Sequence, residues 1–396
     1  MRRYAWALAF GAAVAAPLPA VAQEEAAPPP PISLGFDLRA GYAPPDDGYF
    51  NITDYQHDAL RLFRLSLSVE ARAGRKVALL VQGVSENMDA RIRALYLRVT
   101  PFENRSFDLQ AGLIPPVFGS YPRRAYGEDS PLIGIPVTYQ YLTTMRADAA
   151  PDGADDLLAV RGRGWYVPYP SGSFPSGPGL PLASSNRWDT GVEMRVGRAP
   201  VEAAVAVTRG TLCDPLVRDN NDSLQLAGRV AFQASPAFTL GLSGARGAYL
   251  AESVIQTLPA SLQHPYAQTA AGFDVEHVRG HLLLRAEWVA TWWEMPPVGT
   301  PAIVDPLRAV GGYVEGRYRV AAGWTLGARV DRLTFSTLQG SVRTDTWDAN
   351  VTRVEGGVSW SPRRHVLLRA VYQYNWRDTA RFSKEGFLAG QLGLWF

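Results

Sequence analysis

The sequence predicts an all-β protein, in the form of a closed transmembrane antiparallel β-barrel of about sixteen strands. Three observations lead to this prediction. Apolar and polar residues alternate in sixteen separate segments, short and long connections take turns between these segments, and the chain ends within a strand that finishes in Phe396. Alternation with a period of two is typical of a strand that has one apolar and one polar face.

Residues 1–22, which precede the barrel, have the features of a secretory signal peptide. Arg2 and Arg3 are followed by an almost wholly apolar run, and Ala20-Val21-Ala22 offers the small residues of a cleavage site. The run is shorter than the roughly 20 residues that a membrane-spanning helix needs. We therefore expect export and cleavage, which leaves a Pro-rich periplasmic spacer over residues 23–31 before the barrel of residues 32–396.

Composition excludes several classes of function. The chain has 39 basic and 37 acidic residues, and the signal peptide contributes two arginines and no acid, so the mature chain is neutral. A neutral chain argues against nucleic acid as a partner, because phosphate backbones are bound by basic surfaces. Cys213 is the single cysteine of the sequence, which rules out an intrachain disulfide and a cysteine-based zinc cluster.

The predicted strands follow the alternation in order along the chain. They span residues 32–42, 60–72, 76–84, 90–100, 106–114, 187–197, 200–209, 222–233, 237–247, 268–278, 280–292, 308–320, 323–335, 349–360, 365–376 and 386–396. Most have about ten residues, a length that suits a tilted strand crossing a bilayer.

The connections between predicted strands differ in length according to the order of the strands. Every connection from an even-numbered to an odd-numbered strand is tight, whereas most of the others are long, such as 43–59, 115–186, 248–267 and 293–307. Bacterial outer-membrane barrels have short periplasmic turns and long outer loops. The pattern therefore predicts the outer membrane of a Gram-negative bacterium as the location.

Aromatic residues mark many strand ends and are expected to form girdles at the two lipid–water boundaries. They are Trp188, Trp288, Trp292, Trp324, Trp360, Tyr374, Trp376 and Trp395. The alternative is that they are core residues of a soluble β-protein. At the chain end, Leu392, Leu394 and Phe396 alternate in a pattern that resembles the assembly signal of outer-membrane proteins, and we expect the barrel-assembly machinery to bind it.

The barrel must close on itself, because lipid offers no hydrogen-bond partner to an open sheet edge. With about sixteen strands, the interior is too wide for side chains to fill, and a water channel remains. The alternation predicts that a set of arginines lines this lumen together with a comparable set of carboxylates. The arginines are Arg39, Arg64, Arg98, Arg195, Arg229, Arg285, Arg317, Arg329, Arg353 and Arg369.

The third long connection, residues 115–186, is much longer than the 12–15 residues that structureless loops rarely exceed. It is also rich in apolar residues, so we expect it to fold into the lumen and narrow it. The alternatives are a cap over the surface or an interface with neighbouring subunits. Its arginines are candidates for an anion-binding constriction, since guanidinium groups suit phosphate and carboxylate oxygens; otherwise they are solvated or locally paired charges. They are Arg123, Arg124, Arg146, Arg161 and Arg163.

Two stretches, residues 96–99 (Tyr-Leu-Arg-Val) and 109–119 (Leu-Gln-Ala-Gly-Leu-Ile-Pro-Pro-Val-Phe-Gly), resemble the phosphate-selective porin family of outer membranes. The resemblance implies a homotrimeric channel with cationic side chains along the lumen. The chain departs from the family pattern in two respects. It has only two lysines, Lys76 and Lys384, and the charges expected in the lumen have both signs.

The sequence thus predicts a porin that allows passive diffusion of small hydrophilic solutes, with a weak preference for anions such as phosphate. No catalysis, cofactor or metal is expected, since His277 and His281, although four residues apart, flank a predicted turn rather than lie on a helix. One alternative is a structural or adhesin barrel whose loops form a knob for partners. A less favoured one is an outer-membrane hydrolase with a Ser/His/Asp or acid–His cluster at the outer rim.

Overall fold

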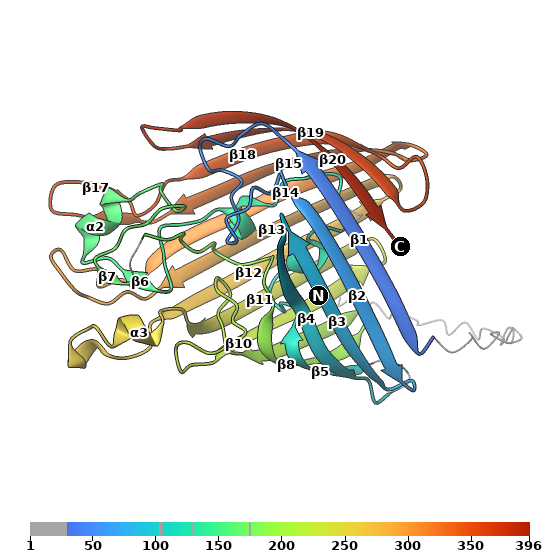
Figure 1. Ribbon diagram of the computed structural model, residues 1–396, viewed down its shortest axis with the longest axis horizontal. Coiled ribbons are helices and arrows are strands. Elements are labelled where there is room, and N and C mark those ends of the chain that lie inside the picture. Colours follow the sequence, from blue (N-terminus) through green and yellow to red (C-terminus); the bar gives the residue numbers. More distant parts are fainter. Residues whose placement is uncertain (1–29, 103, 105, 128–129, 174–175) are drawn as a thin grey trace, which may run out of the picture. The chain divides into compact units, whose positions relative to one another are not determined.

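In the computed structural model, sixteen antiparallel strands form one closed barrel (Figure 1). The structure describes residues 30–102, 104, 106–127, 130–173 and 176–396. The predicted signal peptide, residues 1–22, and the spacer as far as Pro29 lie outside the described residues. Each of the sixteen predicted strands corresponds to a strand of the barrel, so the predicted fold class is confirmed.

The barrel strands, in the order in which they pair, begin and end as follows. They are β1 (Ile32–Tyr42), β2 (Phe63–Ala73), β3 (Val77–Glu86), β4 (Asp89–Val99), β5 (Phe107–Ile114), β8 (Asp189–Arg198), β9 (Val201–Thr208), β10 (Gln225–Ser235), β11 (Phe238–Ala248), β12 (Ala267–Arg279), β13 (Leu282–Trp293), β14 (Leu307–Ala321), β15 (Trp324–Phe335), β18 (Val351–Trp360), β19 (Val366–Arg377) and β20 (Lys384–Trp395).

The connections contain the remaining elements, which are all short. Two small hairpins pair β6 (Ala149–Ala150) with β7 (Ser171–Gly172) and β16 (Thr337–Gln339) with β17 (Thr344–Thr346). The helices are α1 (Val137–Gln140), α2 (Ala154–Ala159) and α3 (Glu252–Ile255), with 3₁₀ turns at Pro122–Arg124 and Ala260–Leu262. None of the helices in the described part of the chain has the length and apolar character to cross a membrane.

The first and last strands close the barrel. β1 pairs with β2 on one side and with β20 on the other, with Leu38 opposite Leu394. At the chain end, the Phe36 N–H donates to the Phe396 carbonyl at 3.0 Å, the Phe396 N–H donates back at 3.1 Å, and the two rings stack. Pairing to the last residue removes the free edge that lipid could not satisfy.

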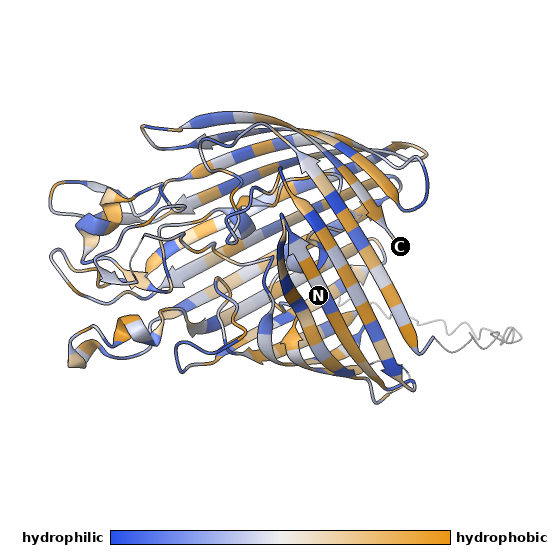
Figure 2. Cartoon of the chain, viewed as in Figure 1, coloured by the Kyte–Doolittle hydropathy of each residue, from blue (hydrophilic) through white to orange (hydrophobic). Residues whose placement is uncertain are grey.

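The two faces of the barrel differ in polarity, as the alternating colours along each strand in Figure 2 show. Outward side chains such as Leu34, Leu242 and Val330 are exposed apolar groups, whereas their inward neighbours are charged or small. This is the pattern of a barrel surrounded by lipid.

The lengths of the connections follow the predicted order, in which short and long connections take turns along the chain. One rim has tight turns such as 199–200, 236–237 and 280–281, and the other has long loops such as 115–188 and 249–266. The helices α2 and α3 and the strands β6, β7 and β17 of the small hairpins gather at this second rim, on the left of Figure 1. By analogy with other membrane barrels, we call the two ends the short-turn rim and the long-loop rim.

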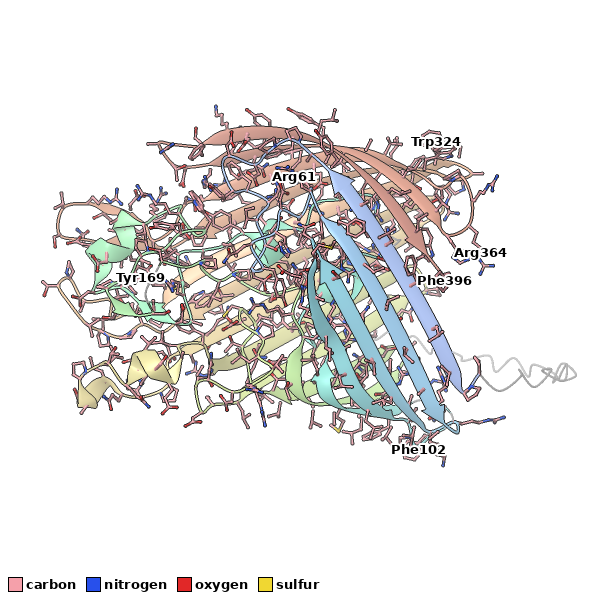
Figure 3. All side chains as sticks on the ribbon, viewed as in Figure 1. Arg61, Phe102, Tyr169, Trp324, Arg364 and Phe396 are labelled. Atoms are coloured by element: carbon pink, nitrogen blue, oxygen red, sulfur yellow. The ribbon has the colours of Figure 1, made fainter. Side chains whose placement is uncertain are left out.

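Aromatic side chains occupy the outward face near both rims, with three exceptions to the prediction. Trp288 faces outward but lies in the middle of β13 rather than near a strand end. Trp324 and Trp360 stack at 5.3 Å beside the short-turn rim, and Figure 3 shows Trp324 at that end. Trp395, however, faces the interior, where Arg39 lies over its ring at 5.5 Å. Since Leu394 faces outward, alternation turns the next side chain inward. Trp188 also packs inward, against Tyr96.

Candidate functional site

One wall of the barrel interior, formed by β13 to β19, binds the long connection between β5 and β8 through carboxylates. Glu355 of β18 accepts hydrogen bonds from the backbone N–H groups of Ile133 (3.2 Å) and Gly134 (2.8 Å). Asp331 of β15 accepts one from the Val137 N–H at 3.2 Å. A carboxylate that accepts backbone N–H bonds makes charge-assisted contacts, which are stronger than neutral ones. The loop backbone is therefore held at defined points.

A third carboxylate on this wall, Glu287 of β13, holds an earlier part of the same connection. It accepts from the backbone N–H groups of Ser120 (3.0 Å) and Tyr121 (3.2 Å), and from the hydroxyl of Tyr313 (3.0 Å). The Tyr139 hydroxyl also donates to it. Glu287 thus connects two parts of the loop to the wall.

Arginines of the same wall bind loop carbonyls. Arg329, Arg353 and Arg369 donate to the carbonyls of Gly134, Ile135 and Gly127 at 2.9, 2.9 and 3.0 Å, respectively. Their side chains are almost fully buried, and Arg329 also pairs with Asp331 (3.0 Å) and Glu355 (2.8 Å). These arginines, expected to face water in the lumen, are instead covered by the chain that they hold.

The connection between β1 and β2 contacts this wall as well, which sequence reasoning did not anticipate. The Phe50 carbonyl accepts from Arg353 at 2.6 Å, and the Gly48 carbonyl accepts from Arg377 at 2.9 Å. Phe50 and Leu60 are buried in a cluster with Leu132 and other apolar residues. Such apolar residues within an otherwise polar loop were the signal that could have found it.

The opposite wall presents arginines that remain accessible. Arg98 of β4 and Arg195 of β8 expose 28% and 32% of their side chains, and Arg123 of the loop exposes 33%. With Arg229 of β10, Arg123 and Arg195 line a cavity of about 190 Å³. Partial desolvation inside the barrel and the neighbouring Arg195 lower the pKa of Arg123 to about 10, a value at which it is still charged at neutral pH.

Carboxylates partly neutralise this second group. Arg123 and Arg195 share Glu193, and Arg229 pairs with Asp274 at 2.6 Å. Arg98 contacts Glu70 at 3.0 Å and, at 4.0 Å, Asp108. We call the four arginines Arg98, Arg123, Arg195 and Arg229 the accessible arginine cluster.

The other predicted lumen arginines also stand on the inward face. Arg39 pairs with Asp37 at 2.6 Å and Arg64 with Glu86 at 3.2 Å, and both arginines are buried. Arg285 pairs with Glu276 at 2.8 Å. Arg317 lines a polar cavity of about 330 Å³ near the short-turn rim. The ten inward arginines therefore divide into buried and accessible groups, a division that strand alternation cannot predict.

The five candidate constriction residues of the loop separate in the structure. Arg123 and Arg124 contact inward strand residues, with Arg124 donating to the Tyr313 hydroxyl. Arg146 pairs with Asp148 of its own loop at 2.9 Å. Arg161 pairs with Asp378 of the β19–β20 connection at 2.8 Å, and Arg163 is exposed. Only Arg123 and Arg124 come together with the inward face of the barrel.

The second half of the same connection packs with other loops at the long-loop rim. An apolar cluster joins Leu157 and Val160 to Val254 of α3, Trp347 and Phe335. Beside it, Asp348 accepts from the backbone N–H groups of Thr144 and Gly162, both at 2.8 Å, and burial raises its pKa to about 6. Because this half is anchored to other loops, its arginines lie away from the inward strand faces.

Comparison with known proteins places this geometry among solved structures. The sequence matches no protein-family model and no curated protein. In structure, the chain is similar to OmpT, an outer-membrane protein of Vibrio cholerae, in trimer form (TM-score 0.55, 11% identity, covering 92% of this chain and 99% of that chain). It is also similar to the outer-membrane channel DcaP of Acinetobacter baumannii (0.54, 11%, 92% and 97%) and to an anion-selective porin from Comamonas acidovorans (0.55, 10%, 92% and 98%).

The chain has the porin fold. At these identities the similarity concerns the fold alone, and it does not single out the phosphate-selective family that the sequence resembles.

The single cysteine and the histidines occupy positions that show no arrangement for catalysis or metal binding among the described residues. Cys213 is buried, close to the Thr211 hydroxyl, and burial raises its pKa well above the usual value. In the described residues, no group of three or more His, Cys, Asp and Glu side chains is placed to hold a metal ion. At the long-loop rim His57 lies 3.0 Å from Asp89, and within the described part of the chain no serine hydroxyl bonds to a histidine.

Proposed function

We propose that this protein is an outer-membrane channel through which small hydrophilic solutes diffuse passively, with a weak preference for anions such as phosphate. The porin fold and the polar inward face support a channel. The observation that carries the proposal is the difference between the two interior walls. One wall uses its charges to hold loop backbone, whereas the other keeps accessible arginines such as Arg195 and Arg98.

In this proposal a solute passes between the held loop segment and the accessible arginine cluster. Guanidinium groups replace part of the hydration of an anion, and charged linings determine ion preference in pores. Because Glu193 and Asp274 neutralise part of the cluster, the preference for anions is weak. The loop segments of residues 119–127 and 130–140 narrow the passage, and no reaction is catalysed.

The proposal extends to location and assembly. The predicted signal peptide and the apolar outer face support residence in the outer membrane of a Gram-negative bacterium. Phe396, which pairs with β1 at the barrel seam, is proposed as the end of the segment that the barrel-assembly machinery binds. A homotrimer is consistent with the trimer form named for one of the similar structures.

Planar bilayer recording tests the channel. Purified protein should give discrete, ohmic conductance steps. In a KCl gradient, the reversal potential should be displaced towards the equilibrium potential of chloride. Arg123→Ala should reduce this displacement, since it removes an accessible cation, while Arg163→Ala, an exposed loop arginine, serves as the matched control. Folded protein that gives no conductance would refute the channel.

A structural or adhesin barrel is the second candidate, because the apolar cluster around Leu157 and Trp347 packs the outer loops into an ordered surface. This function predicts a folded protein without conductance that binds a partner through the long-loop rim. The bilayer recording separates the two candidates directly.

A further inference from the structure

The outward face near the long-loop rim has two copies of one residue pattern. Across β11, β12, β13 and β14, directly paired residues are Arg246, Thr269, Trp292 and Arg308. Across β15, β18, β19 and β20, directly paired residues are Arg332, Thr352, Trp376 and Lys384. Each quartet thus reads cation, threonine, tryptophan, cation over four neighbouring strands.

The two quartets match in their contacts as well as in their order. In the first, Arg246 donates to the Thr269 hydroxyl at 2.6 Å, and in the second Arg332 donates to the Thr352 hydroxyl. All four cations are exposed, and Arg246 exposes 59% of its side chain. The threonine therefore orients the first arginine of each quartet in the same way.

The position of the quartets places these cations at the boundary of the lipid. They lie on the outward face, near the strand ends, beside tryptophans of the kind that gather at the headgroup level of a bilayer. Arg246 pairs with Glu294 at 2.7 Å. For Arg308, Arg332 and Lys384, no carboxylate in the described ranges forms an ion pair. Positive charge at this level attracts anionic lipid headgroups.

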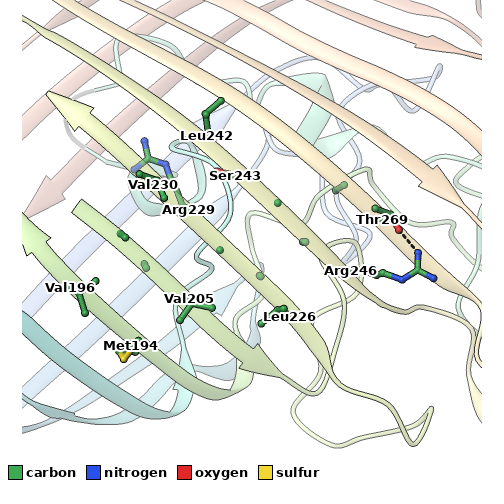
Figure 4. Close-up of a pocket in the computed structure, with 17 residues that line it drawn as sticks. Met194, Val196, Val205, Leu226, Arg229, Val230, Leu242, Ser243, Arg246 and Thr269 are labelled. Carbon is green, nitrogen blue, oxygen red and sulfur yellow. Dashed lines mark hydrogen bonds between the residues drawn. The ribbon is translucent and has the colours of Figure 1, made fainter. Parts of the chain in front are cut away.

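An apolar groove of about 810 Å³ continues from the first quartet along the outer face. Figure 4 shows Arg246 and Thr269 at one part of it, with Leu226, Val205 and Leu242 along the strands. The groove is deep at Gly228 and Gly244, which pair directly on this face and have no side chains to fill it. The groove therefore offers an acyl chain a place to lie below a headgroup at Arg246.

We propose that each quartet binds the headgroup of a lipid in the outer leaflet that carries two separate phosphates, and that the groove holds an acyl chain of the lipid at the first quartet. The two cations of a quartet are three strands apart, roughly 14 Å at about 4.8 Å per strand. A glycolipid headgroup that carries one phosphate near each end can place a phosphate at each of the two cations. The proposal goes beyond the channel function and rests on the proposed outer-membrane location, with the long-loop rim at the outer leaflet.

Native mass spectrometry of the detergent-purified barrel with lipid A, a bisphosphorylated glycolipid, tests this. Wild type should bind two copies tightly. Arg246→Gln with Arg308→Gln, or Arg332→Gln with Lys384→Gln, should leave one tight site and weaken the other roughly 30-fold, from about 1 kcal/mol per surface cation. Monophosphoryl lipid A and phosphatidylcholine should bind more weakly than lipid A to wild type.

Two further variants sharpen the test. Arg363→Gln with Arg364→Gln removes the same charge from the exposed turn at the short-turn rim, where Figure 3 shows Arg364, and should keep both tight sites. Gly228→Leu should weaken only the site at the first quartet, because the leucine side chain would occupy the groove. The barrel should tolerate the change, since a β-carbon at residue 228 meets nothing closer than 3.4 Å.

The results that would overturn the proposal are equally defined. They are two tight sites in the variant lacking all four quartet cations, equal loss in the Arg363/Arg364 variant, or equal binding of phosphatidylcholine and lipid A. Dissociation of an oligomer by Gly228→Leu would make the groove a subunit interface instead. Conductance should be that of wild type in every variant, because all of these side chains lie outside the lumen; failure of lipid binding and failure of the channel are therefore distinguishable.

Discussion

Replacing Glu355 by glutamine should release the long loop from the interior wall. Four donors converge on this carboxylate. The Ile133 and Gly134 N–H groups contact one oxygen, while Arg329 (2.8 Å) and Gln373 (3.3 Å) contact the other. A glutamine amide has only one acceptor oxygen, so its NH₂ group must face two of the four donors. We expect these to be the Ile133 and Gly134 N–H groups, because the oxygen keeps its contact with the charged Arg329.

The size of the effect follows from the two hydrogen bonds that the amide nitrogen cannot accept. A hydrogen bond to a charged group contributes about 1.5–3 kcal/mol, so removing two weakens loop attachment by roughly 3–6 kcal/mol. Since about 1.4 kcal/mol corresponds to a factor of ten, the open population should rise on the order of 100-fold or more. Arg329 keeps Asp331 and Glu315 as partners, so the barrel itself should remain folded.

Hydrogen exchange of the backbone amides is the assay. In Glu355→Gln, exchange at Ile133 and Gly134 should accelerate on the order of 100-fold, while the amides of β18 stay protected. Glu276→Gln is the matched control, because Glu276 is an inward carboxylate of β12 that pairs with Arg285 (2.8 Å) and, among the residues that the structure describes, makes no loop contact. Unchanged exchange at Ile133 and Gly134, or equal acceleration in both variants, would refute the reasoning.

Three other predictions concern selectivity, pH and assembly. Arg195→Gln should shift the reversal potential in a KCl gradient towards cations by several millivolts, since it removes an accessible charge; an unchanged potential contradicts a role in ion preference. The raised pKa of Asp348, about 6 against the usual 3.8, means that the folded protein takes up a proton as pH falls from about 6 to 4, and the unfolded chain does so only below about 4. Acidification from pH 7 to 5 should therefore stabilise wild type relative to Asp348→Asn, as measured by the unfolding midpoint, and a pH-independent difference would show that this carboxyl is not the cause. Deletion of Phe396 removes two backbone hydrogen bonds and a stacked ring at the seam, so the fraction of protein assembled in the outer membrane should fall several-fold, and full assembly in a fractionation assay would count against the seam argument.

The barrel could be predicted from the sequence because its determinants are local. A strand between lipid and water must alternate, so the outward position of Leu394 and the inward position of Arg329 follow from neighbouring residues alone. The same rule turns Trp395 inward, which a search for aromatic residues near strand ends overlooks. The alternation of short and long connections supported the barrel prediction independently, since connection length can be counted without any knowledge of contacts.

What the tertiary structure alone decided is which inward charges face water. Arg329 and Arg195 both stand on the inward face of their strands and have the same side chain. Arg329 is nevertheless covered by loop backbone, whereas Arg195 is accessible. Contacts such as that between Arg329 and Gly134 join residues about two hundred positions apart. Alternation specifies the face on which a side chain stands, whereas burial depends on which distant segment packs against that face, and no local pattern contains that information.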